Sequence, residues 1–137
     1  MGVSAGQGLR RYTIMVAEDF DDTRTILRKA LETNGYLVME ASNGQEAVDL
    51  VWKQCPDLIL MDLNMPLLDG LAATEQIRQC KELCQDVTIL AITAYDTYGM
   101  KEAALEAGCD GYLTKPIDLD NLQKIIDRIL VSRPLTS

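Results

Sequence analysis

Short apolar runs alternate along the chain with segments in which apolar residues recur every three or four positions. The runs occupy residues 13–17, 37–41, 58–61, 87–92 and 111–114, and runs of this length are typical of strands. The intervening segments, which include 98–107 and 119–132, have the spacing of amphipathic helices. Five such strand–helix units predict a parallel sheet with helices on both faces, because right-handed crossovers place the helices there.

The length of 137 residues is enough for one domain with a sizeable core. We expect a flexible leader at residues 1–11, a folded domain at 12–132 and a short tail at 133–137. No apolar run reaches the roughly 18 residues of a membrane span, so no membrane contact is expected. The formal net charge of -8 argues against nucleic acid as a direct partner, because phosphate backbones are bound by clustered lysine and arginine.

Two features of composition limit the chemistry. The four cysteines, Cys55, Cys80, Cys84 and Cys109, have no repeated paired spacing, so we expect free thiols in a reducing cytoplasm rather than a metal site. The chain contains no histidine. Its absence excludes histidine-based zinc sites, histidine general bases and a role as a phosphohistidine donor.

Polar residues stand at the carboxyl ends of four predicted strands. Glu18 and Asp19 follow the first strand, Asp62 follows the third, Thr93 the fourth and Lys115 the fifth. In open parallel sheets, ligands bind outside the carboxyl ends of the strands, where the strand order reverses. If the order is 2-1-3-4-5, the first and third strands are neighbours roughly 4.8 Å apart, and their terminal acids face each other.

Such a cluster of carboxylates requires a cation. Two charges about 5 Å apart repel by on the order of 3 kcal/mol at an effective dielectric of 20. Mg²⁺ fits, because it prefers hard oxygen ligands and takes one or two carboxylates together with phosphate oxygens. Asp62 would then act as a nucleophile that forms an acyl phosphate, with Lys115 and Thr93 stabilising the phosphoryl oxygens. If each motif is considered alone, residues 18–22 could simply be the solvent-exposed start of a helix, and Lys115 could be an exposed lysine in a turn.

Together, and in this order, these residues resemble the receiver domain of two-component response regulators over roughly residues 12–132. The motifs that carry the resemblance are Glu18-Asp19, Met61-Asp-Leu-Asn-Met-Pro66, Asp69-Gly70, Thr93-Ala94, Gly111-Tyr112 and Lys115-Pro116. The resemblance implies a flavodoxin-like, doubly wound sheet of order 2-1-3-4-5. It also implies a cytoplasmic phosphoprotein that is not an enzyme, apart from catalysing its own phosphoryl transfer and dephosphorylation.

The resemblance assigns roles at the metal and phosphoryl site. Asp62 is expected to be the phosphoacceptor. Glu18, Asp19, Asp62 and the backbone carbonyl of Asn64 are expected to hold Mg²⁺. Lys115 is expected to contact the phosphoryl group.

The resemblance also implies a conformational switch. Thr93 is expected to move toward the phosphoryl group, which leaves room for Tyr112 to turn inward and shifts the population of the 94–132 face. A downstream protein partner would recognise that face. Asn64 and Tyr95 are expected to tune dephosphorylation. The phosphoryl donor would be a histidine kinase or a histidine phosphotransfer protein, and the chain is either a stand-alone receiver or part of a larger regulator or hybrid kinase.

Three other readings of the same residues remain. A haloacid dehalogenase-type phosphohydrolase also uses an aspartate nucleophile, Mg²⁺ and a doubly wound sheet, but it has Asp-x-Asp after the first strand. Here Asp62-Leu-Asn64 lacks the second acid and follows the third strand. A phosphorylation-independent binding module would lack a metal acid or the lysine, and none is missing. A flavin carrier needs a phosphate-cradling loop after Ala17, where this chain has acids instead.

Overall fold

The sheet expected from the apolar runs is present in the computed structural model, which describes residues 11–79, 84, 86–94 and 99–131. Within these residues the five strands are β1 (Thr13–Ala17), β2 (Leu37–Ala41), β3 (Leu58–Asp62), β4 (Thr88–Thr93) and β5 (Gly111–Thr114). They pair in parallel in the order β2-β1-β3-β4-β5, so the predicted fold class is confirmed. The expected leader, apart from residue 11, and the expected tail lie outside the described residues.

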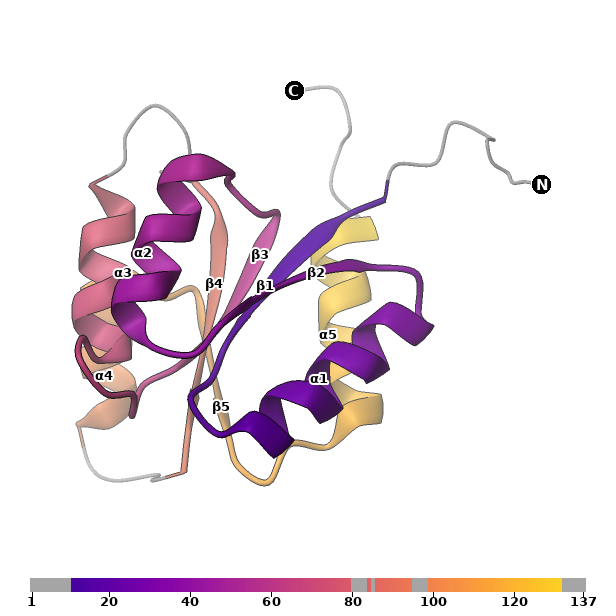
Figure 1. Ribbon diagram of the computed structural model, residues 1–137. Helices are drawn as coiled ribbons and strands as arrows, with labels where there is room; N and C mark the ends of the chain where they lie inside the picture. The colour runs from indigo at the N-terminus through magenta and orange to yellow at the C-terminus, as the bar shows by residue number, and fades with distance from the viewer. Residues whose placement is uncertain (1–10, 80–83, 85, 95–98, 132–137) are drawn as a thin grey trace.

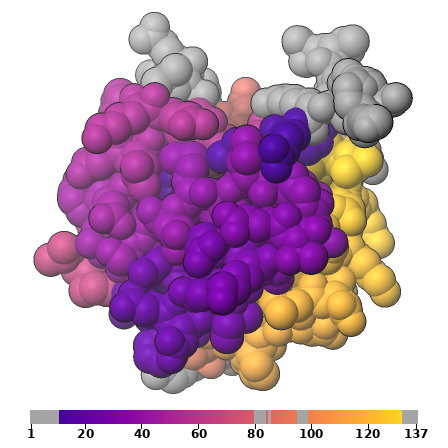
Figure 2. Space-filling model, turned by 45° about the vertical axis from the view of Figure 1, so that its right-hand side comes forward, coloured from indigo at the N-terminus to yellow at the C-terminus, as the bar shows by residue number. Residues whose placement is uncertain are grey.

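Helices cover both faces of the sheet. The described residues form α1 (Asp21–Thr33), α2 (Gly44–Lys53), α3 (Gly70–Arg78), α4 (Met100–Ala107) and α5 (Leu119–Val131). Helices α2, α3 and α4 lie on one face and α1 and α5 on the other (Figure 1). In the space-filling view, the yellow surface of α5 borders the purple surface of the first third of the chain (Figure 2). None of the described helices has the length and apolar character that crossing a membrane requires.

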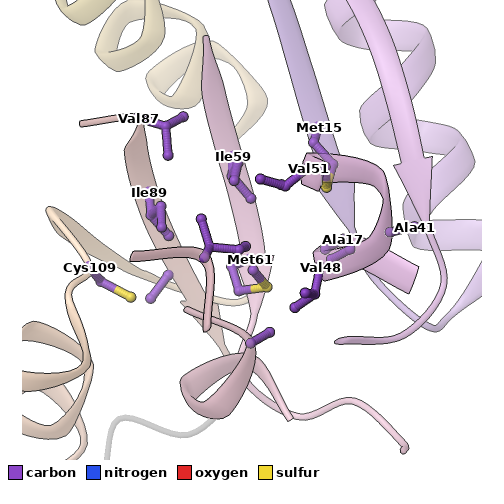
Figure 3. Packing of buried hydrophobic residues seen from close by; sticks show 14 of the residues in the cluster. Met15, Ala17, Ala41, Val48, Val51, Ile59, Met61, Val87, Ile89 and Cys109 are labelled. Carbon is purple, nitrogen blue, oxygen red and sulfur yellow. The ribbon is translucent and has the colours of Figure 1, made fainter. Parts of the chain in front are cut away.

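The centre of the sheet is buried on both faces, and β3 is buried at every residue. On one face, Met15, Ile59 and Met61 pack with Val48 and Val51 of α2 (Figure 3). The other face has its own apolar cluster, to which α1 contributes Leu27 and Leu31 and α5 contributes Leu122, Ile126 and Leu130. Because β3 lies in the middle of both clusters, its carboxyl end has a fixed position between the neighbouring strands.

The loop after β3 is held in place by two close backbone approaches. A Cβ atom on Gly70 would lie 2.4 Å from the carbonyl oxygen of Asp62, and one on Gly44 would lie 1.8 Å from the carbonyl oxygen of Leu68. Only glycine fits at either position without moving the backbone. The side chain of Asp69 then caps α3 by accepting a hydrogen bond of 2.9 Å from the Ala72 amide.

The cysteines differ from the expectation of free thiols. Cys55, between α2 and β3, forms a disulfide with Cys84, between α3 and β4, and their Cα atoms are 5.5 Å apart. The cause is tertiary: both residues lie in loops at the amino ends of the adjacent strands β3 and β4, a proximity that their sequence separation of 29 does not reveal. Cys109 is a buried free thiol, as expected, and Cys80 lies outside the described residues.

Reduction of the Cys55–Cys84 disulfide is expected to lower the free energy of unfolding by about 3–4 kcal/mol, because the bridge restricts the unfolded chain. Urea titration with and without a phosphine reductant measures the difference. The control is the double variant Cys55→Ser with Cys84→Ser, whose stability should not respond to the reductant. An equal effect of the reductant on both proteins would contradict a stabilising bridge.

Leu67 has a φ of 68° and is 85% exposed. A leucine in this left-handed region is strained, whereas glycine adopts it freely. We therefore expect Leu67→Gly to raise the free energy of unfolding by about 1 kcal/mol. Leu67→Ala is the matched control, because alanine removes the same exposed side chain but retains the Cβ atom. Thermal or urea unfolding that ranked the alanine variant as the more stable would contradict this interpretation.

Candidate functional site

Three carboxylates meet at the carboxyl edge of the sheet. Glu18 directly follows β1 and Asp62 ends the adjacent strand β3, and both residues are only 2% exposed. Asp19 is exposed beside them. One carboxylate oxygen from each residue lies within 4.8 Å of the others. The structure therefore brings together the three acids that the strand-end pattern singled out.

Lys115 lies between the two buried acids. Its Nζ is 2.9 Å from Oε1 of Glu18 and 3.1 Å from Oδ2 of Asp62. The residue directly follows β5, and its backbone N–H donates a 2.9 Å hydrogen bond to the carbonyl of Thr93 at the end of β4. The Lys115-Pro116 peptide bond is cis. The ammonium of one lysine thus contacts carboxylates from two other strands.

Burial and charge oppose each other in this pocket. Burial raises the pKa of Glu18, the contact with Lys115 lowers it, and the nearby charge of Asp62 raises it again, with a net shift upward. For Lys115, burial favours a lower pKa, but the carboxylates of Glu18 and Asp62 outweigh it and raise the pKa above its ordinary value. Lys115 therefore stays charged, while the two carboxylates share a single positive charge between them.

The carboxylate of Asp62 is oriented from both sides. Its Oδ1 accepts a 2.9 Å hydrogen bond from the backbone N–H of Asn64, and its Oδ2 contacts Lys115. The Asn64 side chain is exposed. Next to it is an open hollow of about 520 Å³, whose lining includes Asp19, Asn64, Asp69 and Met100. A ligand in this hollow would thus reach Asp19 from the side of the β3–α3 loop.

The expected switch residues lie on the two strands next to β3. Thr93 ends β4 and is fully buried. Tyr112 pairs with Ala91 across β4 and β5, and it is partly buried against the apolar cluster on the α4 side of the sheet. Tyr95, which we expected to shield the phosphoryl group, lies outside the described residues.

The donor set fits a hard divalent cation. All three carboxylates offer oxygen atoms, which are the ligands that Mg²⁺ prefers. The buried Oε1 of Glu18 accepts no well-oriented hydrogen bond from the described residues, although Lys115 Nζ is close. Lys115 brings one positive charge to three carboxylates, so a further cation is electrostatically favoured there. The residues present therefore suit Mg²⁺.

Two residues near the pocket were not identified from the sequence. Arg24 of α1 donates a 2.8 Å hydrogen bond from Nη1 to the carbonyl of Glu18. Phe20, 60% exposed, follows the acidic pair, and its N–H donates to Oε2 of Glu18 at 3.1 Å. The sequence offered only the position of Arg24 three residues after Asp21, which predicts a helical ion pair and not a contact with the loop backbone.

Comparison with known proteins identifies the family. The family model for the response regulator receiver domain matches residues 14–127. The response regulator MprA of Mycolicibacterium vanbaalenii is 41% identical over 109 residues, which are 80% of this chain and 46% of that protein. The MprA protein of Mycobacterium avium is 40% identical over the same length. The chain thus spans less than half the length of the curated relatives it matches.

Solved receiver domains have the same fold and a similar sequence. The receiver domain of the sensor histidine kinase PA1611 from Pseudomonas aeruginosa, with a magnesium ion coordinated in its active site cleft, is 37% identical, with a TM-score of 0.79 over 87% of this chain and 97% of that one. The receiver domain of Ssk1 from Saccharomyces cerevisiae, crystallised with the histidine phosphotransfer protein Ypd1, is 35% identical, with a TM-score of 0.78 over 86% and 88% of the two chains. On these grounds the chain belongs to the receiver domain family of two-component response regulators.

Proposed function

We propose that Asp62 accepts a phosphoryl group in a Mg²⁺-dependent reaction and that the phosphorylated form regulates a protein partner. The observation that carries the proposal is the cluster of three carboxylates within 4.8 Å, of which the two buried ones contact one lysine. The cluster has an uncompensated negative charge, so it favours a divalent cation. Among relatives, the PA1611 receiver domain has magnesium in its active site cleft.

The residues of the pocket would have distinct tasks. Glu18, Asp19, Asp62 and the backbone carbonyl of Asn64 would hold Mg²⁺, which neutralises the oxygens of an incoming phosphoryl group. The hydrogen bond from the Asn64 amide orients the Asp62 carboxylate for attack on phosphorus. A bond then forms between an Asp62 oxygen and phosphorus, while the bond from phosphorus to the donor breaks and its electron pair leaves with the donor. Lys115, already 3.1 Å from Asp62, would balance the added charge.

The conformational response would pass through Thr93 and Tyr112. Thr93 ends the strand next to β3, so its hydroxyl is close to the edge at which the phosphoryl group would be added. Movement of Thr93 would leave space for Tyr112, whose ring packs on the α4 side of the sheet. The 94–132 face, which includes α4, β5 and α5, would then present a different surface to a downstream protein. Asn64 and Tyr95 would set the lifetime of the acyl phosphate.

The phosphoryl donor would be a histidine kinase or a histidine phosphotransfer protein. The 137 residues contain no histidine, so a phosphohistidine must come from outside this sequence. Phe20 and Ile26, exposed by 60% and 54%, give the α1 side of the pocket an apolar character that suits a protein partner. A hollow of about 480 Å³ is lined by Ile26, Lys115, Pro116 and Leu119, among others. The similar Ssk1 receiver domain was crystallised with such a phosphotransfer protein.

A phosphohydrolase is the less favoured alternative. Asp62 lies at the end of the third strand, and residue 64 is asparagine where a haloacid dehalogenase would have its second acid. The family match to receiver domains supports the same conclusion. A hydrolase would turn over many substrate molecules, whereas a receiver accepts one phosphoryl group per molecule.

Incubation of the protein with acetyl phosphate and Mg²⁺ is expected to add the mass of one phosphoryl group, because acetyl phosphate is a small donor that needs no partner protein. Intact-mass spectrometry measures the product. Asp62→Asn should show no gain, and chelation of Mg²⁺ should strongly slow the gain in the unmodified protein. Asp69→Asn is the matched control, since it removes an exposed carboxylate from the same loop.

Two outcomes would contradict the proposal. A mass gain in Asp62→Asn equal to that of the unmodified protein would exclude Asp62 as the acceptor. Continued release of inorganic phosphate from small phosphate esters, over many turnovers, would instead favour the hydrolase.

Asp62→Asn is also expected to raise the free energy of unfolding of the metal-free protein by about 1–3 kcal/mol, because it removes repulsion between two buried carboxylates. The asparagine Oδ1 can still accept the hydrogen bond from the Asn64 amide. Urea unfolding in the presence of a chelator measures the gain. Saturating Mg²⁺ should reduce or reverse it, because the cation stabilises the unmodified protein more. A gain of the same size in Asp69→Asn would show that the effect reflects net charge and not the buried pair.

A further inference from the structure

Arg24 connects the acid pocket, which consists of Glu18, Asp19, Asp62 and Lys115, to the edge strand β2 through three contacts. Its Nη1 donates to the carbonyl oxygen of Glu18 at 2.8 Å, its Nη2 to Oδ1 of Asp21 at 2.6 Å and its Nε to Oε1 of Glu40 at 3.3 Å. The side chain is only 16% exposed. Asp21 opens α1 and Glu40 belongs to β2, so one guanidinium spans the loop, the helix and the edge strand.

The Glu18 carbonyl belongs to the short connection that carries the acidic pair. On one side of it, the Glu18 N–H donates a 3.0 Å hydrogen bond to Ala41 of β2 and thus continues the sheet. On the other side, Asp19 and Phe20 leave the sheet before α1 begins at Asp21. The carbonyl of Glu18 therefore lies where the chain turns away, and its orientation determines how the carboxylates of Glu18 and Asp19 approach Asp62.

We propose that Arg24 is a positioning residue for cation binding: by holding the Glu18 carbonyl, it keeps the Glu18–Asp19 segment oriented toward Asp62. This inference rests on the proposed function, in which those acids hold Mg²⁺. Arg24 does not contact the cation; it fixes the backbone of residues that would. Groups in this outer position commonly change metal affinity by about 10–100-fold when they are removed.

The charge of Arg24 and its hydrogen bond to the Glu18 carbonyl predict opposite changes in the affinity for Mg²⁺, so the inference can be tested. A positive charge near a cation site repels the cation, so loss of the charge alone should tighten Mg²⁺ binding. Loss of the bond to the Glu18 carbonyl should weaken binding, because the acids are no longer held in a converging arrangement. The sign of the change in affinity therefore distinguishes the two roles.

Arg28 provides a matched control on the same helix. Its Nε is 3.3 Å from Oε2 of Glu40 and its Nη1 is 3.0 Å from Oε1 of Glu32. It shares Glu40 with Arg24 and carries the same charge, but its ion pairs are to Glu32 and Glu40 and not to the acid pocket. Arg28→Ala thus removes a comparable charge and a comparable contact with β2, and leaves the hydrogen bond from Arg24 to Glu18 in place.

The experiment is calorimetric titration of Mg²⁺ into the full chain, with thermal unfolding in chelator to show that each variant is folded. Arg24→Ala is expected to raise the dissociation constant for Mg²⁺ about tenfold or more, whereas Arg28→Ala should leave it unchanged or lower it. Arg24→Lys retains the charge but lacks the planar fork that holds several partners, so it should also weaken binding. The lysine variant decides the question if the alanine variant does not fold.

The outcomes separate this inference from the proposed function. Binding of Mg²⁺ to Arg24→Ala or to a folded Arg24→Lys as tightly as to the unmodified protein, or more tightly, would overturn the positioning role. Equal weakening in Arg24→Ala and Arg28→Ala would also overturn it, since a general effect on α1 or β2 would then be sufficient. Failure of the unmodified protein to bind Mg²⁺ at all would instead remove the proposed function on which the inference depends.

Discussion

Two carboxylates buried side by side at one edge of the sheet set the requirements for the rest of this site. Glu18 follows β1, Asp62 ends the adjacent strand β3, and both residues are almost completely buried. An unpaired charge is costly in such a buried position. Lys115 offsets one of the two charges, and the exposed Asp19 adds a third. The arrangement therefore favours the approach of a cation, and an open hollow lined by Asp19 and Asn64 lies beside it.

The strand order produces this concentration of charge. β1 and β3 are distant in sequence but adjacent in the sheet, and β4 and β5 continue the same parallel arrangement. A residue that follows any of these strands consequently lies at a common edge. The apolar clusters on both faces fix β3 in the middle, so Asp62 has little freedom to retreat from Glu18. The repulsion between Glu18 and Asp62 therefore follows from the strand order, and the apolar core keeps the two residues close together.

Local pattern was sufficient to predict a parallel sheet with helices on both faces and polar residues after its strands, whereas the strand order that brings the acids together with Lys115 was implied by the family resemblance. Parallel sheets with buried strands have short, strongly apolar runs, and the polar residue after each run marks the functional edge. The Cys55–Cys84 bridge was not predictable, because it depends on two loops that approach each other only after β3 and β4 pair. The contact of Arg24 with the Glu18 carbonyl was missed for a similar reason: helical spacing indicates ion pairs between side chains, but not contacts with the backbone of a preceding loop.

The disulfide and the candidate site lie at opposite ends of the central strands. Cys55 and Cys84 join loops at the amino ends of β3 and β4, whereas the acids and Lys115 lie at the carboxyl ends of the same sheet. The buried ladder between β3 and β4 separates the two ends. We therefore expect oxidation or reduction of the bridge to change the free energy of unfolding more than the geometry of the acids at the opposite edge of the sheet.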